Sequence, residues 1–409
     1  GILLLEKQKG MEEGYQIQPL PINSGVFCLK KDRFQDIVWI GTDGQGVFLY
    51  STPLYSIKST VLGNYSEKIE RPVRALYLDE DRTFWVGTKG NGILKIYDYE
   101  VDRNISDCRA ETLTTANSAL SSNAVYCFAK SHRNILWIGS EDGLSYYSYK
   151  EKRIKNIPIR VDNEDFKYIH DIYETSDSEL WLASVGMGVL KARVTGTPDN
   201  PAVADAQRYV INDGELGSNY FFTIYAEDES RLLFGNKGYG VFSFNRTTNG
   251  LEPVSTHKHE NMTLNNILAI SKDSSNHYLF GTSYGLIKYT SETSYQFFNT
   301  KNGFLNNTIH AILRNSPDNF WLSTNSGLIN FDTHRNVFRS YGFGDGLKVV
   351  EFSDGAAFRD PRTGTLFFGG INGFVAIRAD GRLEQLYTPP VYFDKLSIFG
   401  EQYNLGEFL

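Results

Sequence analysis

One phrase, an apolar pair followed by a small residue, usually glycine, and a glycine-containing turn, occurs eight times along this chain of 409 residues. It first reads WIGTDGQGVFLY, from Trp39, and last reads FFGGINGFVAI, from Phe367. The first glycine position recurs every 42 to 52 residues, at Gly41, Gly87, Gly139, Ala183, Gly235, Gly281, Ser323 and Gly369. A period of roughly 40–50 residues is typical of propeller blades. The repeat therefore limits the chain to an architecture of equivalent units placed side by side.

The glycines of the phrase allow two interpretations. A glycine-rich loop that follows a strand can cradle a phosphate, or it can be the turn between two strands. A cofactor loop is needed once, whereas this loop occurs in every unit. We therefore interpret the glycines as turn residues, which adopt positive φ angles at little cost, and we expect no cofactor.

Each unit predicts four strands. In residues 72–97, PVRALYLDED alternates as a half-buried strand does, TFWVGT forms a second strand and GILKIYD a third. A more variable outer segment completes the unit. All five tryptophans occupy one repeat position, where a large flat side chain can fill the gap between neighbouring sheets. The predicted fold is all-β, a propeller of four-stranded blades.

Composition excludes several classes of function. The net charge of −7 argues against binding the phosphate backbone of nucleic acids, which needs a basic face. No apolar run approaches the ~20 residues of a membrane span, so we expect membrane contact only through segments outside this chain. Three cysteines make neither a disulfide framework nor a metal set. The pair His257 and His259 has no partner at metal-ligand spacing, and we expect no metal site.

Several phrases resemble a known family. WIGTDGQGV, LWIGSEDGLSYY, the segment 302–312 and EFSDGAAF with GTLFFGGINGF are similar to the periplasmic sensor region of hybrid two-component regulators, which combine a histidine kinase and a response regulator. This region carries W-x-G-T-x-x-G-L repeats, typically in two seven-bladed propellers followed by a β-sandwich called the Y-Y-Y domain. The segment PPVYFDKLSI resembles the start of that domain, so the resemblance covers essentially the whole chain.

The resemblance implies a domain layout. Residues 1–60 would finish an upstream propeller, residues 61–385 would form a seven-bladed propeller, and residues 386–409 would begin a truncated Y-Y-Y-type β-sandwich. The alternative is a single eight-bladed propeller that includes the first complete unit.

The resemblance also implies a function. The chain would be the periplasmic portion of an inner-membrane protein that binds a glycan-derived oligosaccharide. It would signal to a histidine kinase that controls glycan-utilisation genes, as a homodimer in the full-length sensor. No catalytic residue is expected here, because the kinase domains lie outside the chain. Two alternatives stay open, a glycan-active propeller enzyme (lyase or hydrolase) and a protein-interaction scaffold.

The candidate ligand site comes from one position of the repeat. The residue after the first apolar position of each inner strand should face the central funnel, and in six consecutive units it is Arg74, Tyr126, His170, Phe222, Leu268 and His310. We expect Arg71 and Lys89 at the rim. Aromatic, imidazole and guanidinium groups suit a sugar, and the basic groups favour a carboxylated or sulfated one.

Other interpretations of the funnel remain open. It could hold only water, or the ligand could bind between the two propellers. His170 and Asp171 suggest acid–base chemistry together with His310, but neighbours along a strand point to opposite faces. No pair of carboxylates stands at the funnel positions, so we expect a sensor rather than an enzyme.

Overall fold

The computed structural model describes residues 2–7, 15–20, 22–32, 37–51, 57–64, 70–211, 219–228, 230–255, 265–291, 293–378, 396–398 and 401–403. The chain divides into two compact units. One unit is Ile57–Ala379, and the other combines Gly1–Ser56 with Asp380–Leu409. The described residues form strands and short 3-10 helices, and the expected all-β propeller fold is confirmed. None of the described helices has the length and apolar character that a membrane crossing requires.

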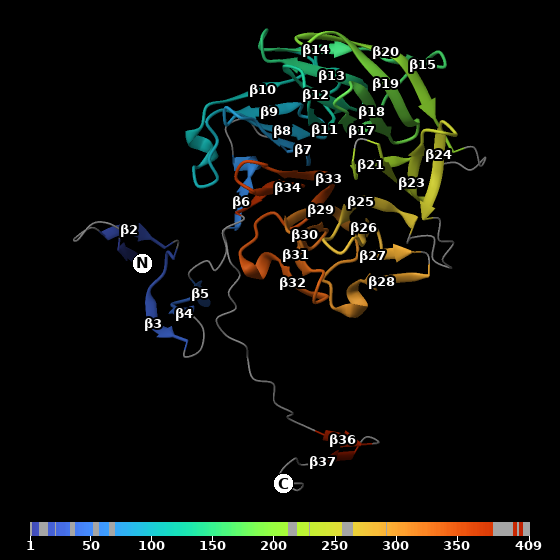
Figure 1. Cartoon of the computed structure of the whole chain (residues 1–409). Coiled ribbons are helices and arrows are strands. Elements are labelled where there is room, and N and C mark those ends of the chain that lie inside the picture. Colours follow the sequence, from blue (N-terminus) through green and yellow to red (C-terminus); the bar gives the residue numbers. More distant parts are fainter. Residues whose placement is uncertain are drawn as a thin grey trace. The chain divides into compact units, whose positions relative to one another are not determined.

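In the unit Ile57–Ala379, the described residues include seven four-stranded antiparallel sheets arranged around a common centre (Figure 1). Six of them follow chain order. They are β7 (Val73–Leu78), β8 (Phe84–Thr88), β9 (Ile93–Ile96) and β10 (Ala110–Leu113); β11 (Val125–Lys130), β12 (Ile135–Ser140), β13 (Gly143–Ser148) and β14 (Arg153–Ile157); β17 (Ile169–Glu174), β18 (Glu179–Ser184), β19 (Gly188–Thr197) and β20 (Asn200–Tyr209); β21 (Phe221–Ala226), β22 (Leu232–Asn236), β23 (Gly240–Asn245) and β24 (Gly250–Ser255); β25 (Ile267–Lys272), β26 (Tyr278–Thr282), β27 (Leu286–Ser291) and β28 (Ser294–Phe298); β29 (Ile309–Ser316), β30 (Asn319–Thr324), β31 (Gly327–Asp332) and β32 (Val337–Tyr341).

The seventh sheet joins the two ends of this unit. It contains β33 (Phe352–Arg359), β34 (Leu366–Gly370), β35 (Gly373–Ile377) and, from the beginning of the unit, β6 (Ile57–Val61). The strand β6 pairs antiparallel with β35, and β33 contacts β7 of the first sheet. The boundary expected between residues 60 and 61 therefore falls inside a strand, because β6 supplies the outer edge of the last sheet.

Shorter elements complete the unit. The strands β15 (Arg160–Val161) and β16 (Glu164–Asp165) form a small hairpin, and the 3-10 helices are η1 (Leu62–Asn64), η2 (Ile105–Asp107), η4 (Thr300–Asn302) and η5 (Phe343–Asp345).

The other unit contains three small sheets among its described residues. They are β1 (Leu3–Lys7) with β2 (Tyr15–Pro19), β3 (Val26–Lys31) with β4 (Ile37–Thr42) and β5 (Val47–Ser51), and β36 (Leu396–Ile398) with β37 (Glu401–Tyr403). The first repeat thus lies in this unit, in the sheet of β3, β4 and β5. Most of the segment 386–409, where we expect the start of a β-sandwich, lies outside the described residues.

Tryptophans and aromatic neighbours fill the space between sheets of the ring. Trp85, Trp137 and Trp181 are 0% exposed and Trp321 is 3% exposed, which confirms that this repeat position is buried in the ring. The ring of Trp181 packs against aromatic side chains of the next sheet, at 4.7 Å between centroids for Phe244. Trp39 differs, because in the three-stranded sheet it is 41% exposed.

The glycines of the repeat have two structural roles. A Cβ on Gly87 would lie 2.8 Å from Val125 of the next inner strand, so only a small residue fits at the first position. The second and third glycines form the turn. The N–H groups of Gly90 and Gly92 both donate to the carbonyl oxygen of Asn123, at 2.9 Å. These amides already have acceptors within the protein, and the structure agrees with the turn interpretation rather than with a phosphate loop.

Candidate functional site

The candidate residues share one backbone feature. In β11, Val125 pairs with Ser140 and Cys127 pairs with Gly139, so Tyr126 is an extra residue in a β-bulge. The same register shift occurs at the start of six inner strands, and the extra residues are Arg74, Tyr126, His170, Phe222, Leu268 and His310. A bulge re-aims the side chain of its extra residue. These six are the residues that the repeat predicts for the funnel.

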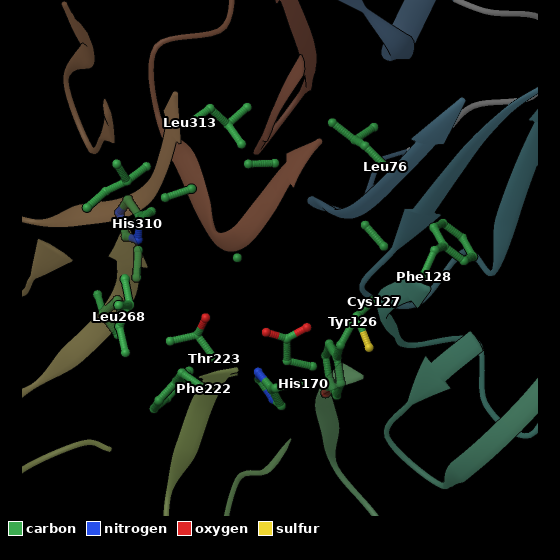
Figure 2. Close-up of a pocket in the computed structure, with 18 residues that line it drawn as sticks. Leu76, Tyr126, Cys127, Phe128, His170, Phe222, Thr223, Leu268, His310 and Leu313 are labelled. Atoms are coloured by element: carbon green, nitrogen blue, oxygen red, sulfur yellow. The ribbon is translucent and has the colours of Figure 1, made fainter. Parts of the chain in front are cut away.

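The bulges surround a cavity of about 200 Å³ at the centre of the ring (Figure 2). Tyr126, His170, Phe222, Leu268 and His310 all line it. Arg74 adjoins this group, since its guanidinium lies over the ring of Tyr126 at 5.6 Å from the centroid. Side chains that are up to 236 residues apart in sequence (from 74 to 310) are thus brought to one central region.

An aromatic row forms one wall of the cavity. The imidazole of His170 stacks on Tyr126 with 4.4 Å between centroids, and it meets Phe222 edge to face at 5.3 Å. Burial lowers the pKa of His170 to about 3, and the positive charges of Arg74 and Lys89 act in the same direction. His170 is therefore neutral near pH 7. The row offers flat rings and one neutral polar edge, a surface against which a sugar ring can pack.

A polar network faces this row, and its centre is a residue that the repeat did not reveal. Asp354 lies in β33, which loses its pairing register between Phe352 and Ala357. The Asp354 carboxylate is 2.5 Å from Nδ1 of His310 and 3.7 Å from the guanidinium of Arg74. The other ring nitrogen of His310 is 2.6 Å from the side-chain oxygen of Asn325, in the turn between β30 and β31.

The network corrects the expected electrostatics. The repeat positions alone predict an excess of positive charge, but Asp354 pairs with both Arg74 and His310. Burial acts to raise the pKa of Asp354, but the hydrogen bond and electrostatic contact with His310 and the charge of Arg74 keep that pKa below its usual value. At the rim, Asp142 pairs with Lys167 at 3.3 Å.

The two predicted rim residues are both exposed. A Cβ on Gly90 would lie 3.4 Å from Cγ of Arg71, so the Arg71 side chain passes over the glycine turn. The backbone of Lys89 forms an isolated antiparallel β-bridge with Ala124, just before β11. The positive charge of Lys89 contributes to the lowered pKa of His170. Arg71 and Lys89 thus lie on the face where the inner strands begin, as expected.

Asp171 corrects another expectation. We expect it on the face opposite to His170, but both residues line the cavity because the bulge interrupts the alternation of the strand. The Asp171 carboxylate accepts hydrogen bonds from the N–H groups of Ile172 at 2.9 Å and Ile224 at 2.7 Å. Burial nevertheless raises the pKa of Asp171 to about 6. The carboxylate ties β17 to β21, which gives it a structural role in the wall.

Metal binding finds no support in the described part of the chain. No group of three or more His, Cys, Asp or Glu side chains is placed there to hold an ion. His257 and His259 lie outside the described residues.

The pKa of His170 predicts an effect of pH on stability. Its folded pKa of about 3 lies below the ~6.5 of an unfolded histidine. Between these values the unfolded chain binds a proton that the folded chain does not, so the free energy of unfolding falls as the pH falls. We expect His170→Phe, measured by urea denaturation at about pH 7 and about pH 5, to lose less stability than the wild type.

The control for this measurement is His132→Phe, which removes an exposed histidine. We expect that variant to keep the pH dependence of the wild type. Equal slopes for the wild type and His170→Phe would contradict a neutral imidazole at His170 in the folded protein.

Several proteins of known structure share this fold. No protein-family model matches the chain. Over 344 residues it is 24% identical to histidine kinase P4 of Formosa agariphila, a match that covers 82% of this chain and 24% of that protein. The extracellular domain of one hybrid two-component system of B. thetaiotaomicron superposes with a TM-score of 0.69 and 24% identity, covering 93% of this chain and 50% of that chain. This chain has the fold of a hybrid two-component sensor domain.

A second extracellular domain of this class from B. thetaiotaomicron superposes with a TM-score of 0.65 at 18% identity, over 93% of this chain and 49% of that chain. The resemblance inferred from the repeats is thereby confirmed. Virginiamycin B lyase of Staphylococcus aureus shares the fold at a TM-score of 0.59 and 14% identity, over 79% of this chain and 99% of that chain. The chain spans about half of the sensor domains it matches and about a quarter of the curated kinase.

Proposed function

We propose that this chain is part of the extracytoplasmic sensor of a hybrid two-component protein and that the central cavity of its ring binds a glycan-derived oligosaccharide. The observation that carries the proposal is the aromatic row of Tyr126, His170 and Phe222. It faces the polar network of Arg74, His310 and Asp354. One wall can stack on the apolar face of a sugar, while the other bonds its hydroxyl groups.

The fold supports the sensor part of this proposal. Extracellular domains of hybrid two-component systems have this fold, and a histidine kinase is 24% identical to this chain over 82% of its length. In the proposed protein, the occupied ring changes the state of a dimeric sensor, and a histidine kinase elsewhere in the protein passes the signal to genes for glycan use. The chain itself binds and does not turn over its ligand.

The chemistry of the cavity favours binding over catalysis. A lyase or hydrolase needs an acid and a base that can exchange protons with the substrate near neutral pH. His170 stays neutral because its pKa is about 3. The Asp354 carboxylate is held by His310 and Arg74. The pKa of Asp171, about 6, would suit proton exchange, but each of its two carboxylate oxygens accepts a hydrogen bond from a backbone N–H group. These groups are arranged to hold the wall and to bind.

The proposal predicts that Tyr126→Ala weakens oligosaccharide binding at least about tenfold, because a central aromatic side chain commonly supplies more than ~1.4 kcal/mol of binding energy. The experiment has two steps on the 409-residue chain. A thermal-shift screen against an oligosaccharide panel finds a ligand, and calorimetric titration then compares the variants. Tyr295→Ala is the matched control, since that tyrosine lies on the outer strand β28 and is 37% exposed.

Equal affinities for wild type and Tyr126→Ala would show that the oligosaccharide does not bind in this cavity. Release of product from any polysaccharide by the purified chain would support the enzyme alternative instead.

A further inference from the structure

The guanidinium of Arg74 is incompletely satisfied. Its Nε is buried and has no hydrogen-bond partner among the residues that the structure describes. Its Nη1 is 3.7 Å from Asp354, which is an ion pair but longer than a hydrogen bond. The side chain is only 13% exposed, so water reaches it poorly. A buried guanidinium with an unused donor favours an additional acceptor, and a carboxylate or sulfate can supply two in parallel.

The present partner of Arg74 comes from an irregular segment. Between Phe352 and Ala357 the strand β33 leaves its register with β34, and Asp354 and Gly355 lie in this interval. The strand β33 contacts β11, β21 and β25 in addition to the inner strands β7 and β29 beside it. Gly355 has a φ of +67°, and no atom lies within 4 Å of a Cβ placed on it. The segment that carries Asp354 therefore has open space beside it.

The cluster is accessible from the cavity. Asp354 is 28% exposed, and His310, whose Nδ1 is 2.5 Å from the carboxylate, lines the cavity itself. Asn325 holds the other nitrogen of His310 from an exposed turn. Arg74 and His310 are thus kept in place by elements other than Asp354, through β7, β29 and the turn that contains Asn325.

We propose that Arg74 and His310 form an anion subsite, that Asp354 occupies it in the empty protein, and that a carboxylate or sulfate group of the ligand replaces Asp354. This inference rests on the proposed function, since it names the chemical class of the ligand that enters the cavity. It also accounts for the pairing of a largely buried guanidinium with a carboxylate beside the cavity. The carboxylate of Asp354 compensates the guanidinium until an anionic sugar arrives, and neutral sugars cannot displace it.

The test uses glucuronate and inorganic sulfate as probes, with glucose as the uncharged reference, in calorimetric titrations of the 409-residue chain. We expect Asp354→Asn to bind glucuronate about 10- to 100-fold more tightly than wild type, the range of one charged hydrogen-bonded contact. The double variant with Arg74→Gln should lose this gain. Asp142→Asn is the matched control, because it removes one negative charge near the same rim but outside the subsite.

An NMR titration of the histidine side chains in the wild type keeps the proposal testable if Asp354→Asn does not fold. The Nδ1–H signal of His310 should shift on addition of glucuronate, because its acceptor changes from Asp354 to the probe, and it should not shift with glucose. The inference is overturned if glucuronate leaves this signal unchanged, if Asp354→Asn binds as the wild type does, or if its gain survives Arg74→Gln.

The outcomes separate this inference from the function it rests on. An oligosaccharide that binds the wild type through Tyr126, with no gain in Asp354→Asn, would overturn the anion subsite and leave the sensor proposal standing. A gain for glucuronate in Asp354→Asn, with no oligosaccharide bound by any variant, would support the subsite and overturn the proposed function.

Discussion

Replacement of Trp137 by alanine is expected to lower the free energy of unfolding by about 3–5 kcal/mol, as truncation of a buried aromatic residue does. Trp137 is 0% exposed, and its indole N–H donates to the Glu174 carboxylate at 2.8 Å. The alanine variant therefore leaves both a cavity and a buried acceptor without its donor, which costs roughly another 1–3 kcal/mol. The expected loss lies at the upper end of the range, and urea denaturation measures it.

A comparison of two phenylalanine variants separates the two contributions. Nε1 of Trp181 has no hydrogen-bond partner among the described residues, whereas Nε1 of Trp137 is bonded to Glu174. We expect Trp137→Phe to destabilise more than Trp181→Phe, because only the former removes a hydrogen bond. Equal losses would show that the Glu174 contact contributes nothing, and an alanine variant as stable as wild type would contradict the packing between sheets.

The second large effect is expected for Gly92→Ala. Gly92 has a φ of +74°, and an added Cβ would lie 2.2 Å from the carbonyl oxygen of Leu113 on β10. The left-handed backbone alone costs a residue with a side chain roughly 1–3 kcal/mol. The collision with a backbone atom comes on top, so β9 and β10 must separate. We expect a loss of several kcal/mol, seen as a fall in the urea midpoint.

Gly90→Ala is the matched control in the same turn. Gly90 also has positive φ, at +129°, but its Cβ would only reach the side chain of Arg71, at 3.4 Å. We expect a smaller loss of stability than for Gly92→Ala and unchanged ligand affinity of the folded protein. If Gly90→Ala were as stable as the wild type but bound the ligand more weakly, the glycine turns would have a role in ligand binding.

The repeat predicts much of this fold for a simple reason. Each unit is under the same physical constraints, so the buried tryptophan, the small residue opposite Val125 and the turn glycines recur in the sequence. From repeat position alone, the same regularity identified five bulged residues that line the cavity, and a sixth, Arg74, that lies over the ring of Tyr126. Periodicity works there because six inner strands begin in the same way, with an apolar residue, the bulged residue and a small or polar one.

The repeat did not predict Asp354 as a site residue, because the seventh inner strand, β33, does not begin in this way. The segment FSDGAAFR contains additional residues between the first pairing position and the next, so it has no single residue equivalent to Tyr126. The role of β6 as the outer strand of the seventh sheet was not predicted for another reason. β6 pairs with residues 373–377, more than 300 residues away, and IKSTV lacks the repeat signature of the other strands.

The simple alternation rule also failed next to a bulge. His170 and Asp171 both line the cavity, although neighbours along a regular strand face opposite sides. The bulge that makes His170 visible as a site residue is the same feature that brings Asp171 to its side. The same register shift occurs in β3 of the other unit, between Val26 and Cys28, so the bulge accompanies the repeat. Strict alternation assumes a regular strand and does not account for it.

An oligosaccharide bound in the cavity at the centre of the ring would be visible in a crystal structure of the chain with the oligosaccharide that gives the largest thermal shift. We predict sugar density packed against Tyr126 and His170, with an anionic group at Arg74 and His310 in place of Asp354. Sugar density elsewhere on the chain, with the aromatic row and the Asp354 contacts unchanged, would contradict binding in this cavity.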